Sequence, residues 1–328
     1  MSLGEARPLG KIGVSLVGMK TLEALEAYLR EIGPEARFEL SYKMSESQLR
    51  GVRPHIERRV LSCHACCPST DFFPNLASAD PAVVRQSLKD MESTLATALD
   101  FGARIVILHA GYVTDSAMPS TYAARKALLS RPEFLKDIRH AEGAICGPDY
   151  CETPHYLRYA ERAKERLAAL ARRYAEAGAR LAVENLNPRV GYLFHTPREM
   201  AALAALDPDL WLCLDVGHLY ISSFAYGFDF LGGVKEIVAT GKVATCHIHA
   251  NSSGPGIFRD DHESMDSPGF PLEEVLDILI PSGANLIVES VDDLGRNTRL
   301  LENARAQRRA KPLPIHPLPT QTRKTEPK

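Results

Sequence analysis

The segment from residue 243 to 262 holds the densest group of side chains that could bind a metal ion. A short apolar run ends in His247 and His249, and a loop broken by glycine and proline then brings Asp260 and His262. This pattern predicts a buried strand that opens into a loop. Imidazoles and carboxylates at such a position suit zinc, manganese or iron. A lone histidine there is more often a core residue, so the prediction depends on whether the pattern recurs.

The pattern recurs at the end of one predicted strand after another. Six strands end in residues that can ligate a metal: His64, His109, Glu184, Asp215, His247 and Glu289. Chance placement would also bring lysine, serine and asparagine to these positions, so a shared metal site is the economical explanation. Three more candidates lie just beyond strand ends: His218, Asp260 and His262. A single ion takes about four to six ligands, so nine candidates allow two or three ions. The alternative is one ion, around which the extra histidines bind substrate.

These residues are positioned by an alternation of strands and helices between residues 11 and 310. The predicted strands are 11–17, 36–42, 59–63, 103–108, 179–183, 210–214, one that begins at 243, and 285–288. The predicted helices are 21–32, 45–50, 81–101, 156–177, 197–206, 228–240, 272–280 and 294–309. Eight such repeats predict an α/β fold, a single parallel (β/α)₈ barrel, whose active site lies where the strands end.

Three segments fall outside the repeat. Residues 110–154 form a long insertion after the fourth strand, which we expect to cover the site or to alter substrate access. Residues 1–10 are a lead into the barrel, and residues 311–328, rich in proline and basic residues, are predicted to be disordered. Within the insertion, a set of four residues has spacings that a zinc clip could use, although their irregularity favours coincidence: His140, Cys146, Cys151 and His155.

Composition narrows the class of protein. The chain has 328 residues, 45% hydrophobic and 24% charged, with a net charge of −2, which is typical of a globular enzyme. This charge gives no general attraction to nucleic acid or to an anionic membrane. The absence of a signal-peptide pattern and of a long apolar run predicts a cytoplasmic protein without membrane association. Seven scattered cysteines argue against a disulfide framework, and a homo-oligomer is left open.

On its strand-end motifs, the chain resembles the xylose isomerase-like TIM-barrel superfamily, which holds sugar phosphate isomerases and epimerases and endonuclease IV (AP endonuclease family 2). The motifs, spread over residues 10–300, are Ser-Cys-His64, Val-Ile-Leu-His109-Ala-Gly, Val-Glu184-Asn-Leu-Asn-Pro, Leu-Asp215-Val-Gly-His218, His247-Ile-His249-Ala-Asn, Asp260-Asp-His262 and Ile-Val-Glu289-Ser. Two positions depart from the family pattern. Met265-Asp-Ser-Pro-Gly269 stands where Gly-Glu-Gly is usual, and Ala250 replaces a common aspartate.

The resemblance implies two alternative site chemistries. Glu184, Asp215, His247 and Glu289 match the four-ligand site of the isomerases and epimerases, where the two glutamates also move protons next to a metal-polarised carbonyl. All nine candidates together match the trinuclear zinc set of the endonuclease IV branch, in which a hydroxide attacks a phosphodiester.

We favour a sugar or sugar-phosphate isomerase or epimerase that uses zinc or manganese, with Glu184 and Glu289 as catalytic residues. The residues of the motifs around Glu184 and Asp215 resemble those of the isomerase and epimerase members, and the sequence has no evident basic stripe. Both features support this function. The alternative is a multi-zinc phosphodiesterase acting on abasic-site DNA or on a small phosphate ester. Phe72 and Phe73 could then be a wedge for the duplex, although such a pair more often packs in a lid or core. Four residues are candidate substrate contacts: His249, Asn185, Arg259 and Arg296.

Overall fold

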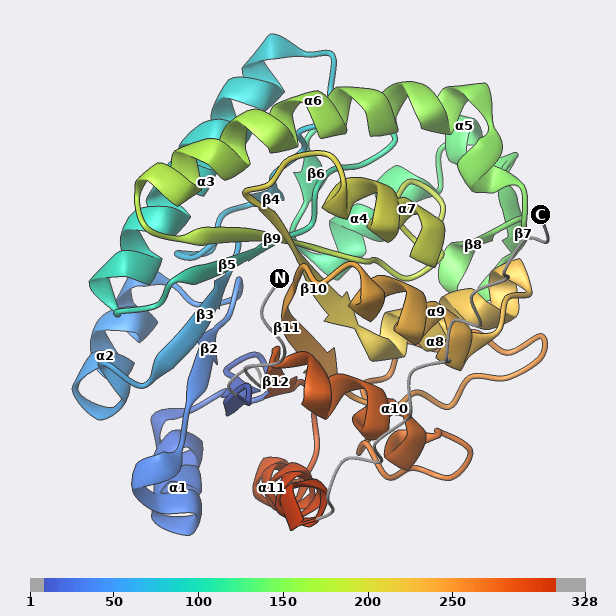
Figure 1. The fold of residues 1–328 in the computed structure, drawn as a ribbon. Helices are drawn as coiled ribbons and strands as arrows, with labels where there is room; N and C mark the ends of the chain where they lie inside the picture. Colours follow the sequence, from blue (N-terminus) through green and yellow to red (C-terminus); the bar gives the residue numbers. More distant parts are fainter. Residues whose placement is uncertain (1–8, 311–328) are drawn as a thin grey trace, which may run out of the picture.

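The computed structural model describes residues 9–310, so most of the predicted lead and all of the proline-rich and basic segment lie outside it. Eight parallel strands close into a barrel in the order β1-β12-β11-β10-β9-β5-β3-β2, which is sequence order around the ring (Figure 1). The strands are β1 (Ile12–Ser15), β2 (Phe38–Leu40), β3 (Val60–His64), β5 (Ile105–Leu108), β9 (Arg180–Glu184), β10 (Leu210–Asp215), β11 (Val243–Ile248) and β12 (Asn285–Val288). The predicted α/β barrel is therefore confirmed.

Helices surround the strands on the outside of the barrel (Figure 1). Those that connect its strands are α1 (Leu22–Ile32), α2 (Glu46–Ile56), α3 (Pro81–Asp100), α6 (Pro154–Glu176), α7 (Pro197–Ala204), α8 (Val216–Tyr226), α9 (Phe230–Ala239) and α10 (Leu272–Leu279), and α11 (Leu294–Ala310) follows the last strand. The predicted start of α3 is confirmed, because the Asp80 side chain accepts a hydrogen bond from the Ala82 amide at 2.8 Å and Pro81 opens the helix.

Helix α8 was not predicted from the sequence. It begins directly after β10, and it is apolar on nearly all sides, so it lacks the polar face by which a surface helix is recognised. Asp215 is both the last residue of β10 and the N-cap of α8, since its Oδ1 accepts from the His218 amide at 2.7 Å. The strand therefore passes into the helix without a loop, and this fixes His218 close to the strand end.

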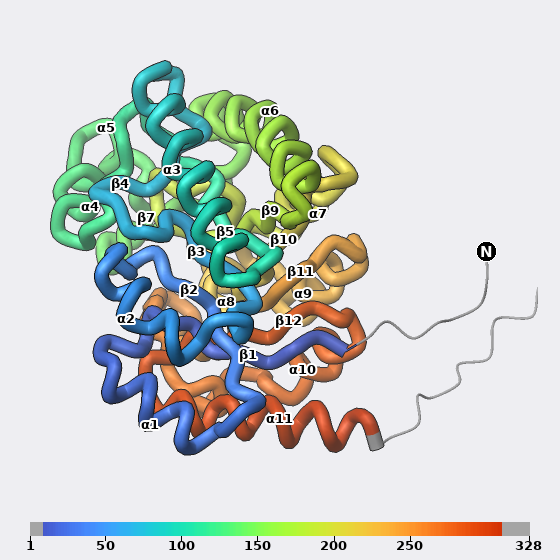
Figure 2. Tube along the Cα trace, turned by 90° about the vertical axis from the view of Figure 1, so that its left-hand side faces the viewer, coloured from blue at the N-terminus to red at the C-terminus, as the bar shows by residue number. Residues whose placement is uncertain are grey.

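The insertion after β5 forms a small layer of its own, with helices α4 (Tyr122–Leu129) and α5 (Pro132–Leu135) and a hairpin of β7 (Ile138–His140) and β8 (Ile145–Cys146). Its first strand, β6 (Met118–Pro119), pairs with β4 (Phe72–Phe73) from the loop after β3. Figure 2 shows α4, α5, β4 and β7 together on one side of the molecule, on the left of that view. The amide of Cys146 also donates to the Pro188 carbonyl at 3.0 Å, which ties the hairpin to the loop after β9.

The apolar core lies in two places. A large cluster fills the layer between strands and helices, and a small one inside the barrel consists of Ile105, Ile107, Ala182, Cys213 and Ala244. All seven cysteines are free, as expected. None of the helices within residues 9–310 is both long and apolar enough to cross a membrane.

Candidate metal centre

Ligand-type side chains from seven barrel segments meet at the carboxyl ends of the strands, in four groups whose donor atoms lie within 4.8 Å of one another; one of these is Glu184, Cys213 and His247. Cluster A consists of His64, His109 and Glu184; cluster B of Glu184, Asp215, His247 and Glu289; cluster C of His218, His249, Asp260 and His262. Glu184 belongs to both A and B, so these clusters share a carboxylate. Every one of the nine sequence-predicted ligands belongs to a cluster, and His249 joins them.

Cluster A is built around one oxygen of Glu184. The Nε2 atoms of His64 and His109 lie 3.0 and 3.2 Å from Glu184 Oε2. The other ring nitrogen of His64 lies 3.0 Å from the main-chain carbonyl of Ala65, to which it can donate. That hydrogen bond leaves the Nε2 lone pair free to face the centre of the cluster, which is the arrangement of a metal-ligating histidine.

Cluster B centres on His247. Its Nδ1 lies 3.3 Å from Glu184 Oε1 and 3.2 Å from Glu289 Oε2, with Asp215 Oδ2 at 3.7 Å. Its Nε2 faces the opposite way, toward Glu39 Oε1 at 3.1 Å. Imidazole Nδ1 and three carboxylates therefore surround a single point.

Cluster C repeats the arrangement seen in A. The Nε2 atoms of His218 and His262 lie 3.5 and 3.4 Å from Asp260 Oδ1, while their Nδ1 atoms lie 3.1 Å from the carbonyls of Asn185 and Glu289. The Nε2 of His249 lies 3.1 Å from Asp215 Oδ1, which links this cluster to B.

The donor set fits a divalent ion. Asp260 Oδ1 is buried and has no hydrogen-bond partner among the described residues, although two imidazole nitrogens face it. A buried acceptor without a partner is costly, and a cation would remove that cost. Neutral nitrogen and anionic oxygen donors are those that Zn²⁺ and Mn²⁺ take, so the buried clusters are consistent with divalent metal binding.

The clusters are strongly charged as they stand. Burial alone would raise the pKa of the Glu184 carboxyl, but the imidazoles of His247 and His109 hold this pKa well below its usual value. Burial would lower the pKa of His262, but the Asp260 carboxylate beside it raises the pKa to about 9. At His109 burial outweighs Glu184, and the pKa is lowered. The imidazoles and carboxylates of the clusters thus shift one another's pKa in the way that neighbouring groups of opposite charge do.

Two short-range features hold the ligands in place. The side chain of Asn185 donates to the Asp215 carbonyl and accepts from the Asp215 amide, both at 2.9 Å, which joins the ends of β9 and β10. Gly217 lets His249 approach α8, because a Cβ on this glycine would lie 2.1 Å from the His249 Cε1 atom. The Asp-Val-Gly-His motif therefore needs its glycine for close approach.

The centre opens to one side. A cavity of about 410 Å³ is lined by Tyr42, Lys43, His262 and Glu289, together with the residues that lead into α1. The side chains of His262 and Asp260 are 23% and 21% exposed, whereas His247 and Asp215 are fully buried. A volume of this size suits a small molecule rather than a polymer.

The predicted substrate contacts have separate positions in the structure. His249 lies within cluster C, and Asn185 bonds to the main chain of Asp215. Arg259 lies 3.8 Å from Glu142 in an exposed ion pair, and Arg296 on α11 is paired with Asp266. Neither arginine lines the cavity of about 410 Å³.

Sequence reasoning missed Glu39 and Tyr42. Glu39 lies in β2, is fully buried, and accepts a hydrogen bond from Ser62 at 2.7 Å in addition to facing His247. A charged residue between Phe38 and Leu40 in an otherwise apolar strand was the available signal. The ring of Tyr42 packs 5.0 Å from that of His64 and forms part of the cavity wall.

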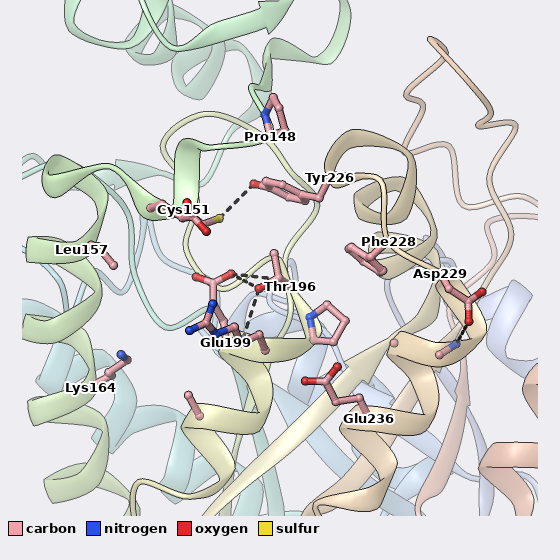
Figure 3. A pocket seen from close by; sticks show the side chains of 16 residues that line it. Pro148, Cys151, Leu157, Lys164, Thr196, Glu199, Tyr226, Phe228, Asp229 and Glu236 are labelled. Atoms are coloured by element: carbon pink, nitrogen blue, oxygen red, sulfur yellow. Dashed lines mark hydrogen bonds between the residues drawn. The ribbon is translucent and has the colours of Figure 1, made fainter.

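The insertion cysteines meet partners other than those considered from their spacing. The Tyr226 hydroxyl lies 3.0 Å from Cys146 Sγ, 3.2 Å from Cys151 Sγ and 2.7 Å from His195 Nδ1. Figure 3 shows Cys151 directed at this hydroxyl, at the edge of a pocket of about 1010 Å³ between α6, α7 and α9. His140 instead packs on Phe258, and His155 is near Tyr159. The four residues are therefore not gathered as one zinc clip.

Comparison with known proteins gives a family and a set of distant folds. A family model described as "Xylose isomerase-like TIM barrel" matches residues 22–310. No curated protein matches the sequence. Among solved structures, a D-tagatose 3-epimerase-like protein is 16% identical with a TM-score of 0.63, over 92% of this chain and 100% of that chain. An L-ribulose 3-epimerase is 18% identical with a TM-score of 0.62 over the same shares. Endonuclease IV from Thermus thermophilus is 20% identical with a TM-score of 0.53, over 92% and 99%. At these identities the structures share the fold.

Proposed function

The chain belongs to the xylose isomerase-like TIM barrel family, and from this premise we propose that it is a divalent-metal-dependent isomerase or epimerase of a sugar or sugar phosphate. The observation that carries the proposal is cluster B, in which one imidazole and three carboxylates converge beside a cavity of small-molecule size. Epimerases of small sugars among the structural neighbours support the same substrate class.

Under this proposal Glu184 and Glu289 are the catalytic pair, and each moves a proton at a carbon next to the substrate carbonyl. Glu289 lines the cavity, so a sugar carbon can reach its carboxylate directly. Glu184 is enclosed by His64, His109 and His247 and is 1% exposed. Its basicity depends on those imidazoles being neutral, as they are when they serve as ligands.

The proposed ligands are the nine predicted residues, with His249 as a tenth, and they would hold one to three ions of zinc or manganese. When bound, the ion supplies a Lewis acid that stabilises negative charge on a substrate oxygen. Tyr42 and Lys43 form the facing wall of the cavity and would restrict how a sugar turns in front of Glu289. Enclosure of Asp215 and His247 keeps water from the inner side of the centre.

A second candidate is a phosphodiesterase on abasic-site DNA or on a small phosphate ester. It is favoured by the three clusters being joined, A to B through Glu184 and B to C through the contact of Asp215 with His249. Several ions bridged by shared carboxylates are the arrangement used in multi-metal phosphate ester hydrolysis.

The test combines metal analysis with two assays of the purified protein. We expect bound Zn or Mn, and proton exchange in D₂O at the carbon next to the carbonyl for members of a panel of ketoses and ketose phosphates. Glu289→Gln should abolish this exchange and, because Glu289 is also a proposed ligand, lower the amount of bound metal. Exchange that persists in the variant would refute the catalytic role of Glu289. No exchange together with cleavage of abasic-site DNA by the wild type would refute the proposal in favour of the second candidate.

A further inference from the structure

We propose that the substrate carries a phosphate ester, and that Arg125 and Arg189 bind this phosphate in a cavity which the insertion builds beside the metal centre. This inference rests on the proposed function and specifies its substrate class. It concerns residues that the sequence alone did not select as a pair, because they lie on different segments of the chain.

The cavity has a volume of about 520 Å³ and lies between α4, the β7–β8 hairpin and the loop after β9. Four basic side chains line it: Arg125, Lys126, Arg139 and Arg189. Glu142 is the one carboxylate in its wall, and its nearest cationic partner is Arg259. No ion pair among residues 9–310 includes any of the four basic residues. A concave surface with four basic side chains and one carboxylate concentrates anions.

Arg125 is held in place by hydrogen bonds, but its Nε–H donor has no acceptor among the described residues. Its Nη1 donates to the carbonyls of Pro119 and Ser120 at 3.1 and 3.0 Å, and its guanidinium lies 5.2 Å from the centre of the Phe73 ring. Its Nε is buried without a hydrogen-bond partner among the described residues. A buried N–H without an acceptor is costly, and an oxygen of a bound anion is a suitable partner for it.

Arg189 is fixed in a similar way. Its Nε donates to the Gly143 carbonyl at 2.9 Å, and its guanidinium lies 5.6 Å from the Tyr192 ring. This hydrogen bond is made by Nε alone, so the terminal nitrogens of the guanidinium are not used by it. A planar guanidinium that is already ordered loses little entropy when it binds a phosphate oxygen.

Aromatic rings connect both arginines to the same candidate ligand, His109. Phe73, under Arg125, packs 5.5 Å from the His109 ring. Tyr192, under Arg189, packs 5.4 Å from Tyr112, whose hydroxyl lies 3.4 Å from His109 Nδ1. In the proposed complex, a sugar with its reacting carbons at the clusters places its terminal phosphate at these arginines. The cavity accommodates a phosphate and a few carbons, which favours a small monoester over a nucleic acid strand.

The experiment compares D-fructose with D-fructose 6-phosphate on the metal-loaded protein, by calorimetric binding and by proton exchange in D₂O. We expect the phosphate ester to bind at least tenfold more tightly than the free sugar. Arg125→Met and Arg189→Met should each raise KM for the ester tenfold or more, with kcat and the KM for D-fructose little changed. Arg131→Met is the matched control, because Arg131 lies in the same insertion but does not line the cavity.

The outcomes separate this inference from the proposed function. Equal affinity and KM for the two sugars, or loss of affinity for both in the arginine variants, overturns the inference. Proton exchange that is still measured in that case leaves the proposed function standing. Arginine-dependent binding of the ester without exchange supports the phosphate site and refutes the isomerase. Cleavage of abasic-site DNA that is lost in the arginine variants would replace the monoester by a phosphodiester and overturn the substrate class.

Discussion

His247 and Glu39 form a fully buried pair, with 3.1 Å between imidazole Nε2 and carboxylate Oε1, although they lie 208 residues apart in the sequence. Because Nε2–H donates to Glu39, the Nδ1 lone pair is directed at Glu184 and Glu289. The hydrogen bond itself goes to Glu39 Oε2 at 3.3 Å, and Ser62 donates to the same oxygen and steadies it. A carboxylate behind a ligating histidine fixes its tautomer and raises its basicity as a ligand.

We expect Glu39→Gln to weaken metal binding about 10- to 100-fold while the fold is kept, because the neutral amide no longer polarises His247. Competition with a chromophoric chelator measures the change. Glu274→Gln, an exposed glutamate on α10, is the matched control and should leave the affinity unchanged. An unchanged affinity in Glu39→Gln would mean that His247 is not a ligand.

Gly217→Ala should lower the metal content of cluster C without unfolding the protein. The added Cβ would lie 2.1 Å from His249 Cε1, so the imidazole or the start of α8 must shift. Metal per chain, measured by mass spectrometry of dialysed protein, should fall by about one ion if cluster C is occupied. Gly51→Ala is the control, since nothing lies within 4 Å of its Cβ position. Full metal content in the Gly217 variant would contradict a ligand role for His249.

Asn185→Ala should destabilise the fold by about 2–4 kcal/mol, because two buried hydrogen bonds to the main chain of Asp215 are lost and leave their partners unsatisfied. Urea unfolding of the metal-free protein gives the change in the free energy of unfolding. Gln307→Ala, at an exposed position on α11, should change it by less than about 0.5 kcal/mol. Wild-type stability combined with poor sugar binding would instead make Asn185 a substrate contact, as considered from the sequence.

His195 should make the stability depend on pH. Burial lowers the pKa of His195 from 6.5 to about 3 in the folded protein, so the unfolded chain takes up a proton first as the pH falls. The stabilisation is complete above pH 6.5 and declines by about 1.4 kcal/mol per pH unit toward pH 3. Between about pH 7 and pH 5, the wild type should therefore lose about 2 kcal/mol more than His195→Gln in urea unfolding. Identical losses would show that the imidazole is charged in the folded state.

Much of the fold could be predicted from the sequence, because apolar runs and caps are local signals. The strands of the barrel and the start of α3 after Asp80 follow from such signals, whereas α8 lacked the polar face that marks a helix. The candidate ligands could also be recognised from the local sequence, since a polar residue such as Glu184 at the end of an apolar strand is unusual in itself. A barrel then brings these ends together by its topology.

The tertiary structure decided which residues act on one another across the barrel. Glu39 and His247 lie on β2 and β11, and nothing in either local pattern reveals that closure of the barrel buries them face to face. The same holds for Arg125 and Arg189, which meet in one cavity because the insertion folds back on the loop after β9. Hydrophobic periodicity and helix capping depend on a few neighbouring residues, so they can be recognised from the sequence alone. Pairing between distant side chains depends on strand register and loop packing, and these are set by the whole chain.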